Sequence, residues 1–88
     1  MNAARRKEIA RAIAMIEAFS GAVAEAAELV EAIRDEEQET FENMPESLQS
    51  SERGEMTEAA IAQLEEALEA LESFDPEQIT SALAEAAA

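Results

Sequence analysis

IARAIAMIEAFSGAVAEAAELVEAI, residues 9–33, decides the fold of this chain because one apolar seam runs through it without a break. The side chains of this seam recur at helical spacing: Ile9, Ile16, Phe19, Val23, Val30 and Ile33. Such a repeat gathers apolar residues on one face of an α-helix. We therefore predict one long helix over residues 3–41, with this seam packed against other helices in an oligomer.

A second apolar row, formed by Met15, Ala22 and Leu29, runs beside the seam. The predicted buried face is therefore wider than a two-stranded coiled coil requires, and the helix is expected to touch more than one neighbour. Gly21 falls inside the pattern, where glycine costs up to ~1 kcal/mol relative to alanine. Because the repeat continues through it, we expect close backbone packing or a slight bend there, and no turn.

Two prolines mark the remaining helix boundaries. The long helix should end near Asn43, because the residue before Pro45 is disfavoured in helical conformation, and a short turn follows. A second helix is expected over residues 51–73, capped by Ser50 or Ser51. Its apolar seam contains four residues: Ile61, Leu64, Leu68 and Leu71.

The segment Phe74–Ile79, FDPEQI, is the most specific boundary signal in the chain. Asp75 is a favoured N-cap, Pro76 suits the first helical position, and Gln78 stands where it could complete a capping box. Phe74 and Ile79 are spaced as a hydrophobic staple. This pattern predicts a short third helix over residues 76–86.

The expected helices differ in length, which predicts a partner. At 1.5 Å per residue the first spans roughly 55 to 60 Å and the second roughly 35 Å, so a simple hairpin leaves part of the long seam uncovered. The third helix could fold back over it, but a second copy of the chain covers it more completely. We therefore predict an all-α, single-domain chain (residues 1–88) that forms a dimeric helical bundle.

Composition excludes several functions. The chain has 21 acidic and 6 basic residues, a net charge of -15, and no Cys or His. Disulfides, imidazole catalysis and the usual zinc ligands are thus ruled out, and direct binding to nucleic acid or anionic membranes is not expected. No apolar run approaches the roughly 20 residues of a membrane span, so we expect a cytoplasmic protein.

Clusters of carboxylates could in principle bind a metal ion for hydrolysis, as glutamate pairs do in some helical pyrophosphatases. Glu65, Glu66 and Glu69 have suitable spacing but point away from the predicted seam or lie at its margin. The serines near the turn lack a general base. We therefore expect no catalytic residue, no metal and no cofactor, and predict that the chain is not an enzyme.

Acidic residues concentrate in the second half of the chain, where residues 35–88 hold sixteen acids and Arg53 alone among bases. The predicted acidic face of the second helix has no basic residue among its members: Glu58, Glu65, Glu66, Glu69 and Glu72. A solvated surface is the ordinary explanation for a charge-rich helix. However, like charges three or four residues apart cost about 0.2 to 0.5 kcal/mol each. A surface that tolerates such repulsion is a candidate mimic of nucleic-acid phosphates.

The stretch DEEQETFENMPESLQSSERGE, residues 35–55, resembles a segment of small helical proteins encoded in bacteriophage and prophage genomes. The resemblance covers about a quarter of the chain and carries over no functional residues. The resemblance implies that the protein acts in the host bacterial cytoplasm, where small phage accessory proteins often inhibit defence systems and acidic ones frequently do so by charge mimicry.

Three functional hypotheses follow. The first is a phage-type, anti-CRISPR-like inhibitor whose acidic face binds the basic surface of a host nucleic-acid-binding complex. The second is a structural or adaptor module that works through its apolar seam. The third is a sponge for an anionic nucleotide, bound between subunits by Arg34 and Arg53. In the turn region, Glu52, Arg53 and Glu55 are further candidates for function.

Overall fold

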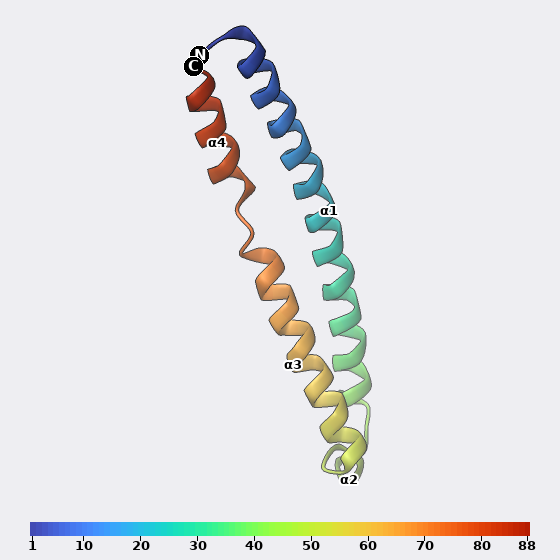
Figure 1. Cartoon of the computed structure of the whole chain (residues 1–88). Coiled ribbons are helices and arrows are strands. Elements are labelled where there is room, and N and C mark those ends of the chain that lie inside the picture. The colour runs from blue at the N-terminus through green and yellow to red at the C-terminus, as the bar shows by residue number, and fades with distance from the viewer.

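The computed structural model describes all residues, 1–88, and all of its regular secondary structure is helical. Its elements are α1 (Ala3–Glu42), α2 (Glu46–Gln49), α3 (Glu52–Glu72) and α4 (Pro76–Ala87). Helices α3 and α4 follow one another along α1, so that the chain forms a long hairpin with both termini at one end (Figure 1). The Cα atoms extend over 68 × 14 × 13 Å. The predicted all-α hairpin is confirmed, with helix boundaries displaced by one residue at most.

Helix α1 continues unbroken through Gly21. At its start, the side chain of Asn2 accepts a hydrogen bond from the backbone N–H of Arg5 at 2.8 Å, and at its end Asn43 is the C-cap. A Cβ atom added at Gly21 would have no other atom within 4 Å. The expected close backbone packing at Gly21 is therefore wrong, because this face of the helix is open to solvent.

This open position gives a first prediction. Gly21→Ala should stabilise the protein by about 1 kcal/mol, because alanine loses less backbone entropy on entering a helix and meets no obstacle here. Thermal unfolding followed by circular dichroism should show a higher midpoint. An unchanged or lower midpoint would mean that the chain needs a glycine at this place.

The turn between α1 and α3 is closed by side-chain hydrogen bonds to backbone carbonyls at the end of α1 and just beyond it. The side-chain amide of Gln49 donates to the carbonyl of Phe41 at 3.0 Å and to that of Met44 at 3.2 Å. The hydroxyl of Ser51 donates to the carbonyl of Leu48 and caps no N–H of α3. Ser51 is thus the N-cap residue of α3, as predicted, but its hydroxyl bonds to the preceding turn and makes no capping hydrogen bond.

The junction between α3 and α4 is largely as predicted. The side chain of Asp75 accepts a hydrogen bond from the backbone N–H of Gln78 at 3.3 Å, and Pro76 is the first helical residue. The side chain of Gln78 makes no reciprocal bond, so the capping box is incomplete. Helix α4 then covers the N-terminal part of α1, where the side chain of Arg6 donates to the carbonyl of Ala87 at 3.0 Å.

The core of the hairpin is thin. Ile61 and Leu68, each 7% exposed, are its only buried hydrophobic residues. From α1, Ile9, Ile16, Val23 and Val30 are half-buried. Phe19 and Ile33 remain 56% and 40% exposed, so the predicted seam divides between the interior and the surface. None of the four helices combines the length and apolarity needed to cross a membrane.

Candidate interaction surfaces

The hairpin has two long flanks, and the register between α1 and α3 determines which side chains lie on each flank. The rings of Phe19 and Phe74 meet edge to face, with centroids 5.3 Å apart. This contact marks one flank. Because side chains three, four or seven residues apart share a side of a helix, the other surface positions can be assigned to this flank, to the opposite flank or to the outer side of their helix.

The flank marked by the two phenylalanines carries no charged residue over most of its length, and we name it the apolar flank. From α1 it contains Ala12, Met15, Phe19, Ala22, Ala26, Leu29 and Ile33. From α3 onward it contains Met56, Ala60, Gln63, Ala67, Ala70, Phe74, Ile79, Ala82 and Ala86. Met15, Leu29 and Met56 are each more than 60% exposed. Large apolar side chains thus follow this flank in contact with water.

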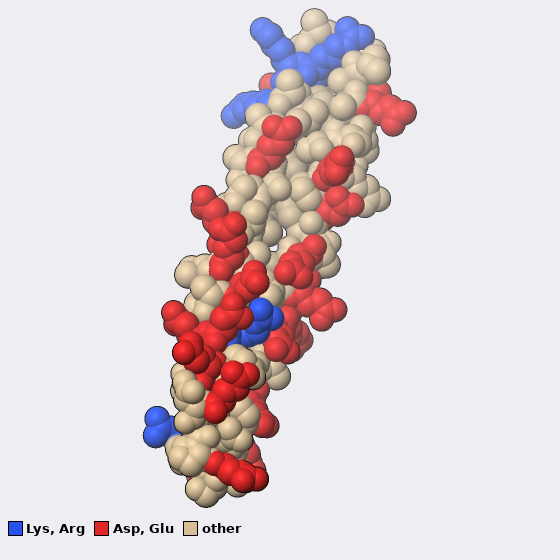
Figure 2. Space-filling view, turned by 180° about the vertical axis from the view of Figure 1, so that it is seen from behind, with Lys and Arg blue, Asp and Glu red and all other residues tan.

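The opposite flank is acidic, and we name it the acidic flank. From α1 it contains Glu17, Glu28, Glu31, Asp35 and Glu42, and from α3 it contains Glu55, Glu58, Glu65, Glu69 and Glu72. All ten are exposed. Seen from behind, the acidic side chains gather along the middle and lower parts of the rod, whereas basic ones cluster mainly at the end that holds the termini (Figure 2). Acidic and apolar side chains therefore lie on opposite flanks of the rod, and acidic and basic side chains are concentrated at different levels along it.

Four of the five predicted acidic-face residues lie on the acidic flank. Glu58, Glu65 and Glu72 form one row at seven-residue spacing, with Glu69 beside it. Glu66 lies on the outer side of α3, between the two flanks. Sequence reasoning missed the five carboxylates that α1 adds to this surface, because they become neighbours of the α3 row only in the hairpin.

The basic residues are largely unpaired within the chain. Only Arg34 forms ion pairs, at 3.0 Å to Asp35 and 3.9 Å to Glu31. Its guanidinium is thus occupied, and the hypothesis of a nucleotide bound by Arg34 and Arg53 gains no support from this arrangement. In the first turn of α3, Glu52, Arg53 and Glu55 are exposed. Of the three, only Glu55 lines a hollow, of about 480 Å³, which Glu46 and Glu58 also line.

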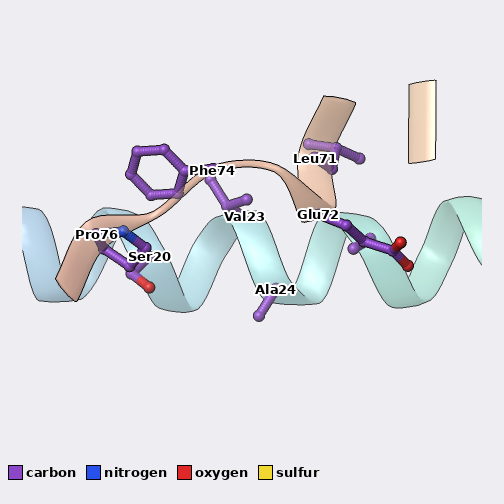
Figure 3. A pocket seen from close by; sticks show the side chains of 8 residues that line it. Ser20, Val23, Ala24, Leu71, Glu72, Phe74 and Pro76 are labelled. Atoms are coloured by element: carbon purple, nitrogen blue, oxygen red, sulfur yellow. The ribbon is translucent and has the colours of Figure 1, made fainter. Parts of the chain in front are cut away.

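A hollow of about 280 Å³ lies where α3 gives way to α4. Leu71, Phe74 and Pro76 lie along one side of it, and α1 contributes Ser20, Val23 and Ala24 to the other (Figure 3). Glu72 is its one charged lining residue. The hollow is mainly apolar, and no group of three or more acidic side chains in the chain converges as a metal site.

Comparisons of the chain with models of protein families, with curated proteins and with solved structures found no match.

Proposed function

We propose that this chain is a non-catalytic, phage-type accessory protein that inhibits a host nucleic-acid-binding defence complex by presenting its acidic flank to a basic surface. The observation that carries the proposal is the gathering of ten exposed carboxylates on one side of an elongated rod. The resemblance of residues 35–55 to phage-encoded helical proteins is the reason to propose an anti-CRISPR-like role in the bacterial cytoplasm.

The charge density of this flank is close to that of one nucleic-acid strand. Its carboxylates extend from the level of Glu17 to that of Glu42, about 38 Å at 1.5 Å per residue. One negative charge therefore falls about every 4 Å, compared with about 3.4 Å along one strand of DNA. A groove lined with Lys and Arg that accepts a phosphate backbone would meet a similar line of charge.

The same carboxylates repel one another in the free protein. Arg34 is the only base paired with them, and like charges at these spacings cost about 0.2 to 0.5 kcal/mol per pair. Contact with a basic partner relieves this repulsion, and the attraction accelerates association at low salt. We therefore expect binding to weaken steeply as salt concentration rises.

The test compares two variants with equal charge. The first changes Glu58, Glu65, Glu69 and Glu72 of the acidic flank to Gln, and the control changes Glu25, Glu39, Glu66 and Glu85, which lie outside both flanks. Each loses four charges, and Gln matches Glu in helix propensity. Circular dichroism confirms that both stay folded.

Each protein is immobilised, and proteins captured from bacterial lysate are identified at low and high salt. The unmodified chain should capture a nucleic-acid-binding complex that elutes in high salt, and the control should retain it. The flank variant should bind about 100-fold more weakly, which corresponds to a loss of about 2.8 kcal/mol at about 1.4 kcal/mol per tenfold change in affinity. Equal binding by both variants would refute the role of the flank.

The alternative, an assembly or adaptor module, is favoured by the exposed side chains of the apolar flank, because monomeric proteins rarely expose a long contiguous apolar surface. Capture of a partner that resists high salt and is retained by the acidic-flank variant would support this alternative.

A further inference from the structure

We propose that the apolar flank is the interface of a homodimer in which two hairpins pair antiparallel about a two-fold axis and close a four-helix bundle. This inference does not depend on the proposed function, because it concerns the opposite flank and rests on different observations.

The first observation is the amount of surface that one chain exposes. The accessible surface is 6492 Å², whereas a compact monomer of 9.5 kDa exposes about 5,000 Å². The excess, about 1,500 Å² per chain, exceeds the roughly 800 Å² that each partner buries in a standard interface. A second copy of the chain can cover a surface of this size. The dimer then has two layers of helices, whereas one hairpin alone has only two buried core residues.

The second observation is that the apolar row of α1, from Met15 to Ile33, is symmetric in size about its centre. A two-fold axis near residue 24 brings Met15 opposite Ile33, Phe19 opposite Leu29, and Ala22 opposite Ala26. Large side chains then meet large ones at both ends, and alanines meet at the middle, where the helices approach most closely. An isologous interface requires this self-complementarity, whereas a groove for an unrelated partner does not.

The same axis suits α3. The register set by Phe19 and Phe74 places the centre of the α1 row level with residues 67–69. Here too the small residues, Ala67 and Ala70, are central, while Met56 and Ile79 lie toward the two ends. An antiparallel pairing of α3 with its copy brings Met56 of one chain near Ile79 of the other.

The third observation is the charge at the two ends of α1. Its first turns carry Arg5, Lys7 and Arg11, and its last turns carry Glu39 and Glu42, which is the reverse of what the helix macrodipole favours. None of these bases has an acidic partner within the chain. In the antiparallel dimer, the basic first turns of α1 lie beside the acidic last turns of α1 of the second copy, so that each end of α1 meets opposite charge.

Mass measurement by light scattering tests the dimer. The unmodified chain should have twice the 9.5 kDa mass of one chain at micromolar concentration. Leu29→Glu places a carboxylate in the interface and should weaken dimerisation at least 100-fold, while helix content persists because Leu29 is 63% exposed in the hairpin. The control Ala32→Glu adds the same charge on the outer side of α1 and should remain dimeric.

Disulfide cross-linking tests the orientation, since the chain has no cysteine of its own. A mixture of Met15→Cys and Ile33→Cys chains should form the mixed disulfide readily, and neither variant alone should cross-link efficiently. Self-cross-linking of each variant would indicate a parallel pair and overturn the proposal, as would a monomeric mass for the unmodified chain or an intact Leu29→Glu dimer.

Discussion

Gly54→Ala is expected to destabilise the protein by about 2 to 3 kcal/mol, even though alanine is the better helix former. Gly54 is buried in the first turn of α3, beneath the turn that α2 makes. A Cβ atom there would lie 2.6 Å from the carbonyl oxygen of Leu48 and closer still to that of Gln49. Because the obstacle is backbone, it cannot be relieved by a change of rotamer.

Chemical denaturation of Gly54→Ala and Gly21→Ala gives a matched comparison. The same substitution in the same protein should lower the free energy of unfolding at residue 54 and raise it at residue 21. A gain in stability at residue 54 would mean that the turn over α3 yields at little cost, and that the hydrogen bonds of Gln49 to the end of α1 contribute little.

The helix boundaries could be predicted from the sequence because local chemistry determines them. A proline restricts the residue before it, and Pro45 accordingly follows the end of α1 within a few residues. Asp75 and Pro76 start α4 because the side chain of Asp75 accepts from an otherwise free N–H and Pro76 has no N–H to satisfy. Such signals need no knowledge of distant parts of the chain.

The division of the apolar residues of α1 could not be predicted in the same way. Phe19 and Ile33 fit the seam by spacing, yet they belong equally to a second repeat with Met15, Ala22 and Leu29. Two adjacent apolar repeats on one helix indicate that the helix packs against two neighbours. They do not indicate which repeat faces the other helices of the same chain. The path of α3 and α4 along Ile9, Ile16, Val23 and Val30 decides that question.

The acidic surface was predictable in kind but not in extent. The absence of bases among the glutamates of α3 is visible in the sequence, whereas the contribution of Glu17, Glu28 and Glu31 depends on the antiparallel register. That register also sets the two flanks on opposite sides of the rod. A dimer closed by the apolar flank therefore keeps both acidic flanks outside, and the two proposals are compatible in one assembly.

A final prediction separates the core of one chain from the interface between chains. Leu68→Ala should lower the free energy of unfolding by about 2 to 4 kcal/mol at every protein concentration, because Leu68 is 7% exposed within the hairpin and its removal leaves a cavity. Leu29→Ala should cost little where the chain is monomeric, since Leu29 is 63% exposed there. In the dimer the same change should cost about 1 kcal/mol or more per chain, because the second copy buries this side chain.

Denaturation at several protein concentrations distinguishes the two variants. The stability of a dimer rises with concentration because association draws the equilibrium toward the folded state. The free energy of unfolding of the Leu68→Ala chain should be lower but should still rise with protein concentration. That of the Leu29→Ala chain should rise less steeply with concentration. If the unfolding midpoints of all three proteins are independent of concentration, the thin core of Ile61 and Leu68 supports the hairpin alone and the apolar flank binds no second copy.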